Sequence, residues 1–386
     1  MPIDIFFPSM IKIGGGAIAE ASRILKRLGV RHPLIVTDAF LVRTGLAGTL
    51  RQQLETAGIA CGVFSETVPD PTTDAVAAGL RVFSAGEHDA LVSLGGGSPI
   101  DTAKAIGMLA ANGGRARDYK VPNEIPRKSL PHLAIPTTAG TGSEVSRFTV
   151  ITDSETDEKM LIAGATLVPD AAIVDFELTM TMPARLTADT GTDSLTHAIE
   201  AYISRKANAF ADAFAATAMK TIWAELPVAF REPGNQRARE FMMLAATQAG
   251  MAFSSASVAL VHGMSRPIGA HFHVPHGLSN AMLLPAVTAF SVKAAEERYA
   301  ECARTMGIAN PADSNAEAGR KLVDALFERN HSLEVPSPKT YGIPEERYFA
   351  LIPLMAKQAL ASGSPQNNPR IPTSDEIEQL YRQVWS

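Results

Sequence analysis

The sequence has little cysteine and no surplus of basic residues. Only two cysteines, Cys61 and Cys302, occur in 386 residues, and they lie far apart. A disulfide framework is therefore not expected, and a reducing compartment, the cytoplasm, is the natural location. Lys and Arg number 35 against 40 Asp and Glu, which gives a formal net charge of -5. This balance argues against a general nucleic-acid binder, because neutralising phosphates requires a basic surplus.

Long hydrophobic runs are also missing. No stretch reaches the roughly 18 uninterrupted apolar residues of a membrane span, and no basic region precedes the short apolar stretch near the N-terminus, so a signal peptide is not expected. Hydrophobic residues still make up 46% of the chain and charged residues 19%, which is ample material for a core. At roughly 150 residues per domain, the length predicts two domains, with three as the alternative. We expect a cytoplasmic enzyme without a membrane partner.

Two kinds of pattern divide the chain near Pro183. Before it, short apolar runs typical of strands buried on both faces alternate with longer helical patterns that end at glycine. The strand-like runs are 33–38, 89–96, 132–138 and 171–176, and the helical patterns are 17–29, 46–58 and 73–86. This alternation predicts βαβ units and a parallel sheet covered by helices. After Pro183 helical stretches dominate, so we predict an α/β domain over residues 1–180 and a helical domain over residues 181–386.

A glycine-rich turn at residues 95–97 follows one of these strand-like runs and precedes a helical pattern. Glycine lets the backbone approach a ligand closely, and a helix N-terminus presents free N–H groups to an anion. Ser98, Pro99 and Asp101 fit a helix start, with an N-cap hydroxyl, a proline in the first turn and an acid at the third position. The motif is not GxGxxG, so a pyrophosphate cradle and an ordinary tight turn both remain open.

Two further polar features follow predicted strands. The segment 134–146 is rich in Thr, Gly and Ser, which can bond ligand oxygens but also occur in ordinary surface loops. Asp38 ends the first strand-like run, where a carboxylate can accept hydrogen bonds from a ribose hydroxyl. Taken alone, each feature favours the ordinary structural role, and for Asp38 that role is a solvated acid or an N-cap.

Histidines gather in the second half, where five of the nine fall between residues 197 and 276. Asp193 and His197 stand four residues apart, so both project from one face of a helix. With His262 and His276 they supply one oxygen and three nitrogens, a suitable donor set for a divalent first-row ion. His271 and His273 are alternative ligands that spacing alone does not exclude.

Long motifs, in order along essentially the whole chain, resemble the iron-containing (group III) alcohol dehydrogenases. They are GGGSPIDTAKAI (95–106), PTTAGTGSEVSRFTVIT (136–152), residues 183–204, LVHGMSRPIGAHFHVPHGLSNAMLLP (260–285) and NNPRIPTSDEIEQLY (367–381). The resemblance implies a Rossmann-like parallel-sheet domain followed by an all-helical metal-binding domain, an architecture shared with dehydroquinate synthase-like proteins. It also implies an NAD-linked enzyme that interconverts a primary alcohol and its aldehyde, holds Fe²⁺ or Zn²⁺, and forms a homodimer or higher homo-oligomer.

Matching positions carry the family's roles onto individual residues. The implied metal ligands are Asp193, His197, His262 and His276. The implied cofactor-binding residues are Asp38, Gly96, Gly97, Ser98, Asp101, Thr137, Thr138, Thr141, Lys159 and Leu178. In the family an acid at the position of Asp38 goes with NAD rather than NADP. The segments 193–200 and 262–277 favour the alcohol dehydrogenases over the glycerol dehydrogenase-like and dehydroquinate synthase-like enzymes that share the fold.

One position departs from the family pattern. Many members carry a second histidine four residues after the first, and here that position is Arg266. On a helix Arg266 would share a face with His262, although Pro267 disfavours helical geometry at the preceding residue. A guanidinium in the site would suit an anionic group, so an anionic semialdehyde is an alternative substrate. An arginine held by a structural carboxylate fits the sequence equally well.

Overall fold

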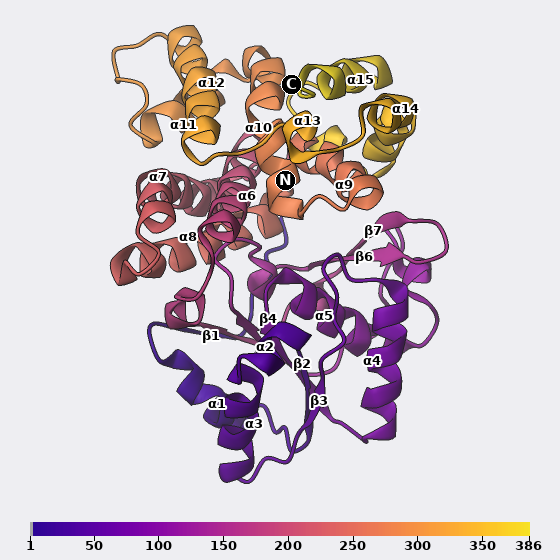
Figure 1. Cartoon of the computed structure of the whole chain (residues 1–386). Coiled ribbons are helices and arrows are strands. Elements are labelled where there is room, and N and C mark those ends of the chain that lie inside the picture. Colours follow the sequence, from indigo (N-terminus) through magenta and orange to yellow (C-terminus); the bar gives the residue numbers. More distant parts are fainter. Residues whose placement is uncertain (1–2) are drawn as a thin grey trace. The chain divides into compact units, whose positions relative to one another are not determined.

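The computed structural model describes residues 3–386 and divides into two compact units, one ending at Thr181 and the other spanning Met182–Ser386. Figure 1 shows that the labelled strands belong to the first unit. Among the described residues, the second unit contains helices without strands. The predicted fold class, a Rossmann-like parallel-sheet domain followed by an all-helical domain, is therefore confirmed.

The first unit is built on a six-stranded parallel sheet with the order β1-β8-β5-β4-β2-β3. Its strands are β1 (Met10–Ile13), β2 (Pro33–Val36), β3 (Gly62–Phe64), β4 (Ala90–Gly95), β5 (His132–Pro136) and β8 (Ala171–Val174). The four inner strands are buried at every residue, as expected when both faces of a parallel sheet are covered. They are the four strands that the apolar runs predicted.

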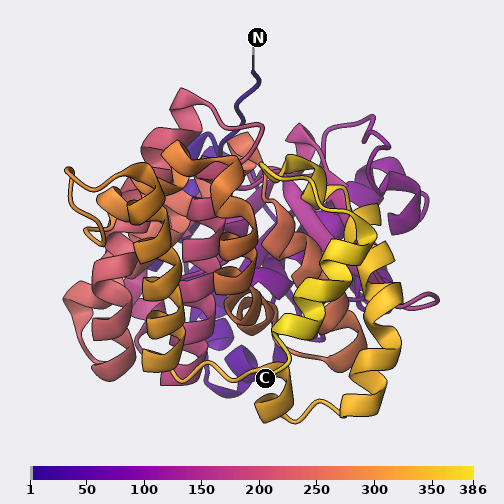
Figure 2. The same cartoon turned by 90° about the horizontal axis from the view of Figure 1, so that it is seen from above.

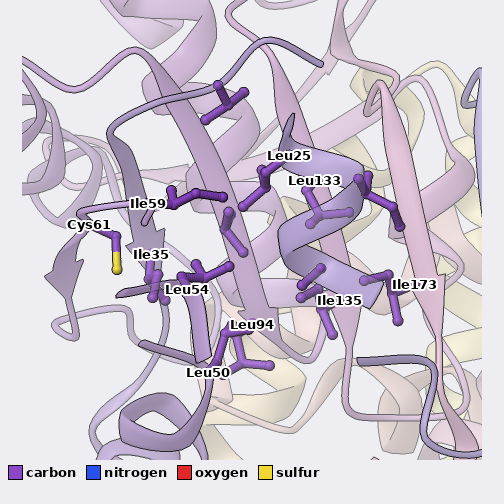
Figure 3. Packing of buried hydrophobic residues seen from close by; sticks show 14 of the residues in the cluster. Leu25, Ile35, Leu50, Leu54, Ile59, Cys61, Leu94, Leu133, Ile135 and Ile173 are labelled. Atoms are coloured by element: carbon purple, nitrogen blue, oxygen red, sulfur yellow. The ribbon is translucent and has the colours of Figure 1, made fainter. Parts of the chain in front are cut away.

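Two apolar cores lie on opposite faces of this sheet, because successive strand residues point to opposite sides. Ile35 packs into one core and its neighbours Leu34 and Val36 into the other. The first core, shown in Figure 3, includes residues of α1 (Ala21–Arg27) and α3 (Leu46–Thr56). The second includes residues of α4 (Thr73–Ala85) and α5 (Gly97–Asn112). The helical patterns of the sequence therefore cover the sheet as predicted.

The remaining elements of the first unit are short or lie outside the main sheet. The strands β6 (Phe148–Asp153) and β7 (Glu158–Ala163) form an antiparallel hairpin that the sequence analysis did not predict. The first helical pattern begins as a 3₁₀ turn before α1. The short helical segments are η1 (Ala17–Glu20), α2 (Ala39–Arg43), η2 (Ala116–Tyr119), η3 (Ser143–Val145), η4 (Ala165–Leu167) and η5 (Phe176–Thr179).

The second unit is organised around α6 (Ala184–Ile203), which packs against α7 (Ala209–Arg231), α8 (Gln236–Ala256) and α10 (His276–Ser291). Figure 2 shows the helices of this unit, coloured from magenta to yellow, from a second direction. Its other helical segments are α9 (Leu260–Phe272), η6 (Val292–Ala294), α11 (Glu296–Thr305), α12 (Asn315–Ser332), α13 (Pro338–Tyr341), α14 (Glu345–Ala361), η7 (Ser364–Asn367) and α15 (Ser374–Gln383).

Among residues 3–386, no single helix is long and apolar enough to cross a membrane. Helices α8 and α9 meet the same criteria of length and composition only when taken together, and they are bent by 106° at the break between them.

A buried histidine lies inside the sheet of the first unit. His132 opens β5, and its Nε2 is 2.8 Å from the hydroxyl of Ser93 on β4. Burial, together with the positive charge of Lys104, lowers the pKa of His132 to about 3. Between pH 6.5 and about 3 the unfolded chain therefore binds a proton that the folded chain does not. Stability is lost as the pH falls through this window.

We expect His132→Gln to flatten the acid-induced loss of stability. In the wild type, His132 lowers the free energy of unfolding by about 1.4 kcal/mol for each pH unit below the pKa of this histidine in the unfolded chain. Urea unfolding between pH 4.5 and pH 7 would measure it as the slope of unfolding free energy against pH. The matched control is His331→Gln, which changes an exposed histidine of α12. Equal slopes for His132→Gln and the wild type would contradict the assignment.

Candidate metal centre and nucleotide-binding loops

Helix α6 carries three buried polar side chains on one face. Asp193, His197 and Glu200 are separated by four and three residues and are all nearly fully buried. Side chains at these intervals lie above one another on a helix. Buried polar groups need partners, because desolvation without a compensating bond is costly. The partners come from α9 and α10.

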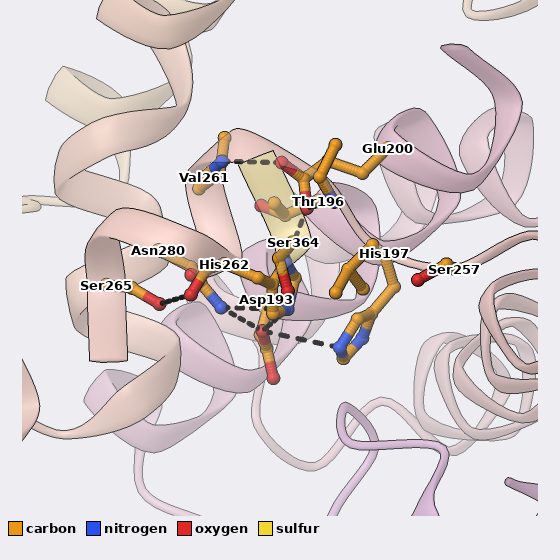
Figure 4. A network of polar contacts seen from close by, with 12 residues as sticks. Asp193, Thr196, His197, Glu200, Ser257, Val261, His262, Ser265, Asn280 and Ser364 are labelled. Atoms are coloured by element: carbon orange, nitrogen blue, oxygen red, sulfur yellow. Dashed lines mark hydrogen bonds and ion pairs between the residues drawn. The ribbon is translucent and has the colours of Figure 1, made fainter. Parts of the chain in front are cut away.

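The Asp193 carboxylate is surrounded by imidazole nitrogens. Its Oδ1 lies 3.5 Å from His262 Nε2, 3.8 Å from His276 Nε2 and 3.9 Å from His197 Nε2. Two ligands at about 2.1 Å from a tetrahedral ion are about 3.4 Å apart. The spacing therefore fits four ligands around one divalent ion. Figure 4 shows Asp193, His197 and His262 turned toward one another.

Three of the four predicted ligands form the tightest group. One donor atom each from Asp193, His262 and His276 lie within 4.8 Å of one another. His197 joins them through Asp193, and its ring stacks on that of His262 with centroids 4.5 Å apart. The structure thus brings all four residues of the predicted donor set together.

Glu200 orients one of these ligands, and sequence reasoning missed it. Its Oε2 accepts hydrogen bonds from His262 Nδ1 at 2.7 Å and from the Ala259 N–H at 2.8 Å. Its Oε1 accepts another from the Val261 N–H at 2.6 Å. A proton on Nδ1 leaves the Nε2 lone pair of His262 facing Asp193, which is the tautomer that a metal requires. The signal available in the sequence was an acid seven residues after Asp193 on the same helix face.

Asn280, also missed, occupies the point where the ligand atoms meet. Its Nδ2 lies 2.6 Å from Asp193 Oδ1, 3.2 Å from His262 Nε2 and 3.3 Å from His276 Nε2. Its Oδ1 is buried without a hydrogen-bond partner in the part of the chain that the structure describes. The lone pairs of three ligands therefore converge on one position, and a bound cation would accept all of them. This convergence is the evidence that the residues fit a metal ion.

The electrostatics of the cluster favour positive charge. Burial alone would raise the pKa of Asp193, but the three histidines around it hold that pKa well below its usual range. Burial would likewise lower the pKa of His262, yet its bonds to Asp193 and Glu200 raise that pKa above the ordinary value. Asp193 is therefore ionised at neutral pH, as a metal-ligating carboxylate must be.

The start of α10 lies directly against α6 because residue 277 is glycine. A Cβ at Gly277 would lie 2.4 Å from the Asp189 carbonyl oxygen and 3.3 Å from Asp193 Cβ. This close approach brings the preceding residue, His276, to the carboxylate. The His276 side chain is 36% exposed, against 3% for Asp193 and His262. One side of the cluster is therefore open, as a catalytic metal site requires.

The two alternative ligands lie elsewhere. His271 is near the end of α9, with its Nε2 2.8 Å from Gln358 Oε1. His273 caps the same helix in the left-handed conformation, at φ 54°. The two histidines thus belong to the last turn and the C-cap of a helix. Neither belongs to the ligand group found among the described residues.

Arg266 is helical despite the following proline, because α9 continues to Phe272. The residue is 7% exposed, and its Nη1 donates to Ser364 Oγ at 3.0 Å. Burial lowers its pKa to about 10, against the opposing effect of the Glu200 charge. Its hydrogen-bond partner among residues 3–386 is this hydroxyl, so the alternative of an arginine held directly by a structural carboxylate is not observed there.

In the first unit, three predicted cofactor elements meet at one edge of the sheet. Asp38, the glycine turn and Thr137 follow β2, β4 and β5, which are adjacent and parallel. Ligands of open parallel sheets bind beyond these carboxyl ends. A Cβ on Gly97 would lie 2.9 Å from Thr141 Cγ2, and one on Gly96 would lie 3.3 Å from Thr138. The two loops therefore pack on each other, and a side chain at Gly97 would force Thr141 to shift.

The predicted helix start needs a correction. Helix α5 begins at Gly97 with Gly96 as its N-cap, and no side chain caps it. Ser98 lies inside the first turn and is not the N-cap. Both carboxylate oxygens of Asp101 accept bonds from elsewhere, from Ser143 Oγ at 2.6 Å and from the Val150 N–H at 3.0 Å. The uncapped N–H groups of this helix are thus left for another acceptor.

Three of the predicted cofactor residues have neighbours that bear on their roles. Asp38 is the N-cap of α2 and accepts the Leu41 N–H at 2.9 Å, which is one of the ordinary roles considered above. Lys159 on β7 pairs with Asp70 at 2.7 Å, with 5% of its side chain exposed. Leu178 packs against the first apolar core.

Each of the two units matches a family of known proteins. Residues 8–176 match the family described as "Iron-containing alcohol dehydrogenase", and residues 187–385 match "Fe-containing alcohol dehydrogenase family, C-terminal". The chain is 41% identical over 380 residues to the NAD-dependent methanol dehydrogenase of Bacillus methanolicus, covering 98% of this chain and 99% of that protein.

Two solved structures are similar over the full chain. The structure of a 1,3-propanediol oxidoreductase has a TM-score of 0.95 at 35% identity and covers 100% of both chains. A sulfoacetaldehyde reductase from Bifidobacterium kashiwanohense, in complex with NAD⁺, has a TM-score of 0.88 at 30% identity, covering 100% of this chain and 99% of that chain.

We expect His262→Ala or His276→Ala to remove the bound metal while leaving the fold intact. The loss of affinity should exceed the roughly 10–100-fold that follows removal of a residue orienting a ligand. Metal analysis after dialysis, with circular dichroism for the fold, would measure it. The control is His273→Ala, which changes a histidine that caps α9. Equal metal loss in His273→Ala would overturn the ligand assignment.

Proposed function

Because the chain belongs to the iron-containing alcohol dehydrogenase family, we propose that it interconverts a primary alcohol and its aldehyde, using NAD and a metal held by Asp193, His197, His262 and His276. The observation that carries the proposal is the convergence of one buried carboxylate and three imidazoles on one position, with His276 partly exposed. A non-catalytic metal-binding protein has no need for such an open side.

The metal ligands set the charge of the proposed site, and Glu200 orients one of them. When bound, the metal supplies a Lewis acid for the substrate oxygen, and NAD exchanges hydride with the substrate carbon. Asp193 compensates one positive charge, and three neutral imidazoles compensate none, so the site retains a net charge of about +1 and stays electrophilic. Glu200 fixes the tautomer of His262, which keeps Nε2 available as a ligand.

The proposed metal is Fe²⁺, supported by the family's name, with Zn²⁺ as the alternative. A donor set of nitrogen and oxygen binds Zn²⁺ more tightly than Fe²⁺, so iron occupancy depends on supply. The test is metal analysis of anaerobically purified protein, followed by assays of alcohols and aldehydes with NAD(H). Metal-dependent consumption of NADH with an aldehyde is expected. If no alcohol or aldehyde supports metal-dependent turnover, the proposed function is wrong.

NAD preference is proposed from Asp38. Its carboxylate lies beyond the end of β2, where it can accept a ribose hydroxyl but would repel a 2′-phosphate. One oxygen, Oδ1, is engaged by the Leu41 N–H, and this bond fixes the side chain at the sheet edge. Asp38 is therefore both the N-cap of α2 and the residue from which we propose the preference for NAD.

We expect Asp38→Asn and Asp38→Gly to raise the ratio of NADPH to NADH efficiency by about tenfold or more, because a like-charge contact is removed. Asparagine keeps the helix cap, and glycine at an N-cap costs only a few tenths of a kcal/mol. Steady-state kinetics with both cofactors would show the change. Equal efficiency of the wild type with NADH and NADPH would contradict the role of Asp38.

An anionic aldehyde is the second candidate substrate, supported by Arg266. This guanidinium lies one helical turn after His262, is nearly buried, and has a hydroxyl rather than a carboxylate as its hydrogen-bond partner. A buried cation with no carboxylate in hydrogen-bond contact is costly even with the charge of Glu200 nearby, and an anionic group of the substrate would compensate it. One related structure is that of a sulfoacetaldehyde reductase, whose named substrate carries a sulfonate.

We expect Arg266→His to lower kcat/KM for succinic semialdehyde more than kcat/KM for a neutral aldehyde of similar length. The difference between the two losses should correspond to roughly 2 kcal/mol or more of transition-state stabilisation. Arg266→Lys, which keeps the charge, should lose less. The comparison of the two aldehydes is the internal control, since a structural defect lowers both. An equal loss for both substrates, or none, would rule out the charged contact.

Three expectations from the sequence stay predictions. They are a homodimer or higher homo-oligomer, a cytoplasmic location, and the lack of nucleic-acid and membrane partners. The two cysteines are buried and unpaired, which supports a reducing compartment. The net charge of -5 supports the lack of a nucleic-acid partner.

A further inference from the structure

We propose that Lys104 and Asp101 of α5 are positioning residues that fix the segment 143–150, and through it the threonine loop against the glycine turn, before NAD binds. The inference rests on the proposed NAD-linked function. It gives Asp101 a role different from the cofactor contact that the family resemblance implied.

Lys104 is a buried cation whose contacts all lie in one segment. The residue is 2% exposed, and its neighbours Ala103, Ala105 and Ile106 are fully buried. Its Nζ donates to Ser146 O at 2.9 Å and Phe148 O at 2.8 Å. The Ser143 and Ser146 hydroxyl oxygens, each at 3.2 Å, are the other two acceptors. An ammonium in an apolar layer is costly. Here that cost is offset by the bonds to this segment and by the negative charges of Asp101 and Glu144.

Asp101, one turn earlier, holds both ends of the same segment. Ser143 Oγ donates to its Oδ1 at 2.6 Å, and the Val150 N–H donates to its Oδ2 at 3.0 Å. The Asp101 carbonyl oxygen also accepts Thr149 Oγ1 at 3.0 Å. Ser143 is shared, because its hydroxyl accepts from Lys104 and donates to Asp101. The two α5 side chains and the Ser143 hydroxyl therefore form one connected network.

The segment needs this network because it has little regular structure. Between β5 and β6 the only helical turn is η3, so several backbone groups lack a partner in a ladder. Buried backbone carbonyls must be satisfied, and Lys104 does this for residues 146 and 148. A purely apolar side chain of the same volume would leave both oxygens unpaired.

The network acts on the nucleotide site through Thr141. This residue lies two positions before Ser143, and its Oγ1 accepts the Ser143 N–H at 3.4 Å. Thr141 also limits the space at Gly97, at 2.9 Å from a Cβ built there. Movement of Ser143 would therefore move Thr141, which packs on the glycine turn. If Thr141 is already held in place, NAD binding does not have to order the loop. Loss of this support should therefore weaken NAD binding more than it lowers turnover.

The test compares Lys104→Met with the wild type. Methionine keeps the length of the side chain and removes all of its donors. The matched control is Lys26→Met, at an exposed lysine of α1. We expect the Kd for NADH, measured by fluorescence on metal-free protein, and the KM for NAD to rise about tenfold or more. The kcat at saturating NAD should stay within about threefold, because the metal ligands lie in the other unit.

A double-mutant cycle tests the shared network directly. If Ser143 and Lys104 act together, Ser143→Ala combined with Lys104→Met should raise the Kd by less than the product of the single effects. If Lys104→Met does not fold, Ser143→Ala and Ser146→Ala provide the same measurement with smaller changes. An unchanged Kd in folded variants, or an equal fall in kcat at saturation, would overturn the positioning role. If the wild type itself does not bind NADH, the proposed NAD-linked function is what fails.

Discussion

The second unit depends on the buried carboxylate of Asp193. A buried carboxylate is tolerated only if hydrogen-bond donors or a cation compensate its charge, and α6, α9 and α10 each supply one of the imidazoles that would share such a cation. His197 comes from the same helix, His262 from α9 and His276 from α10. The packing of these three helices therefore determines the candidate metal site, because its ligands come together only where the helices meet.

Both candidate sites are supported by buried charged groups that hold other parts of the chain in place. Glu200 fixes the ring of His262 and also binds the N–H groups that begin α9. In the first unit, Lys104 and Asp101 bind the chain between η3 and β6. In each case a buried charged side chain satisfies backbone groups at an irregular point of the chain. Local order at the site is thus achieved by long-range side-chain contacts rather than by regular secondary structure.

The sequence predicted those features that depend on one continuous pattern. The inner strands β2, β4, β5 and β8 were visible because burial on both faces produces uninterrupted apolar runs. The edge strands β1 and β3 are short and only partly buried, so they leave a weak signal. The hairpin of β6 and β7 alternates largely between buried and part-buried residues, but the sequence analysis assigned no element to residues 148–163.

The predicted donor set came from spacing and family resemblance, whereas its supporting residues depend on tertiary contacts. Asn280 meets Asp193 only because α10 crosses α6. Asp101 looked like a helix-capping acid because it stands early in α5, and only the fold shows that its carboxylate faces β6 and η3. No periodicity in one segment encodes such a contact, because the partner lies more than forty residues away.

Gly277 has a consequence for protein engineering. Replacing a glycine in the first turn of a helix with alanine is a common route to stability, because alanine has the higher helix propensity and restricts the unfolded chain. Here the added methyl group would collide with the Asp189 carbonyl oxygen at 2.4 Å. The collision would push α10 away from α6, and a metal ligand precedes the glycine directly. Thermostabilisation by consensus or propensity should therefore leave this helix start unchanged, since the same backbone contact sets both packing and ligand position.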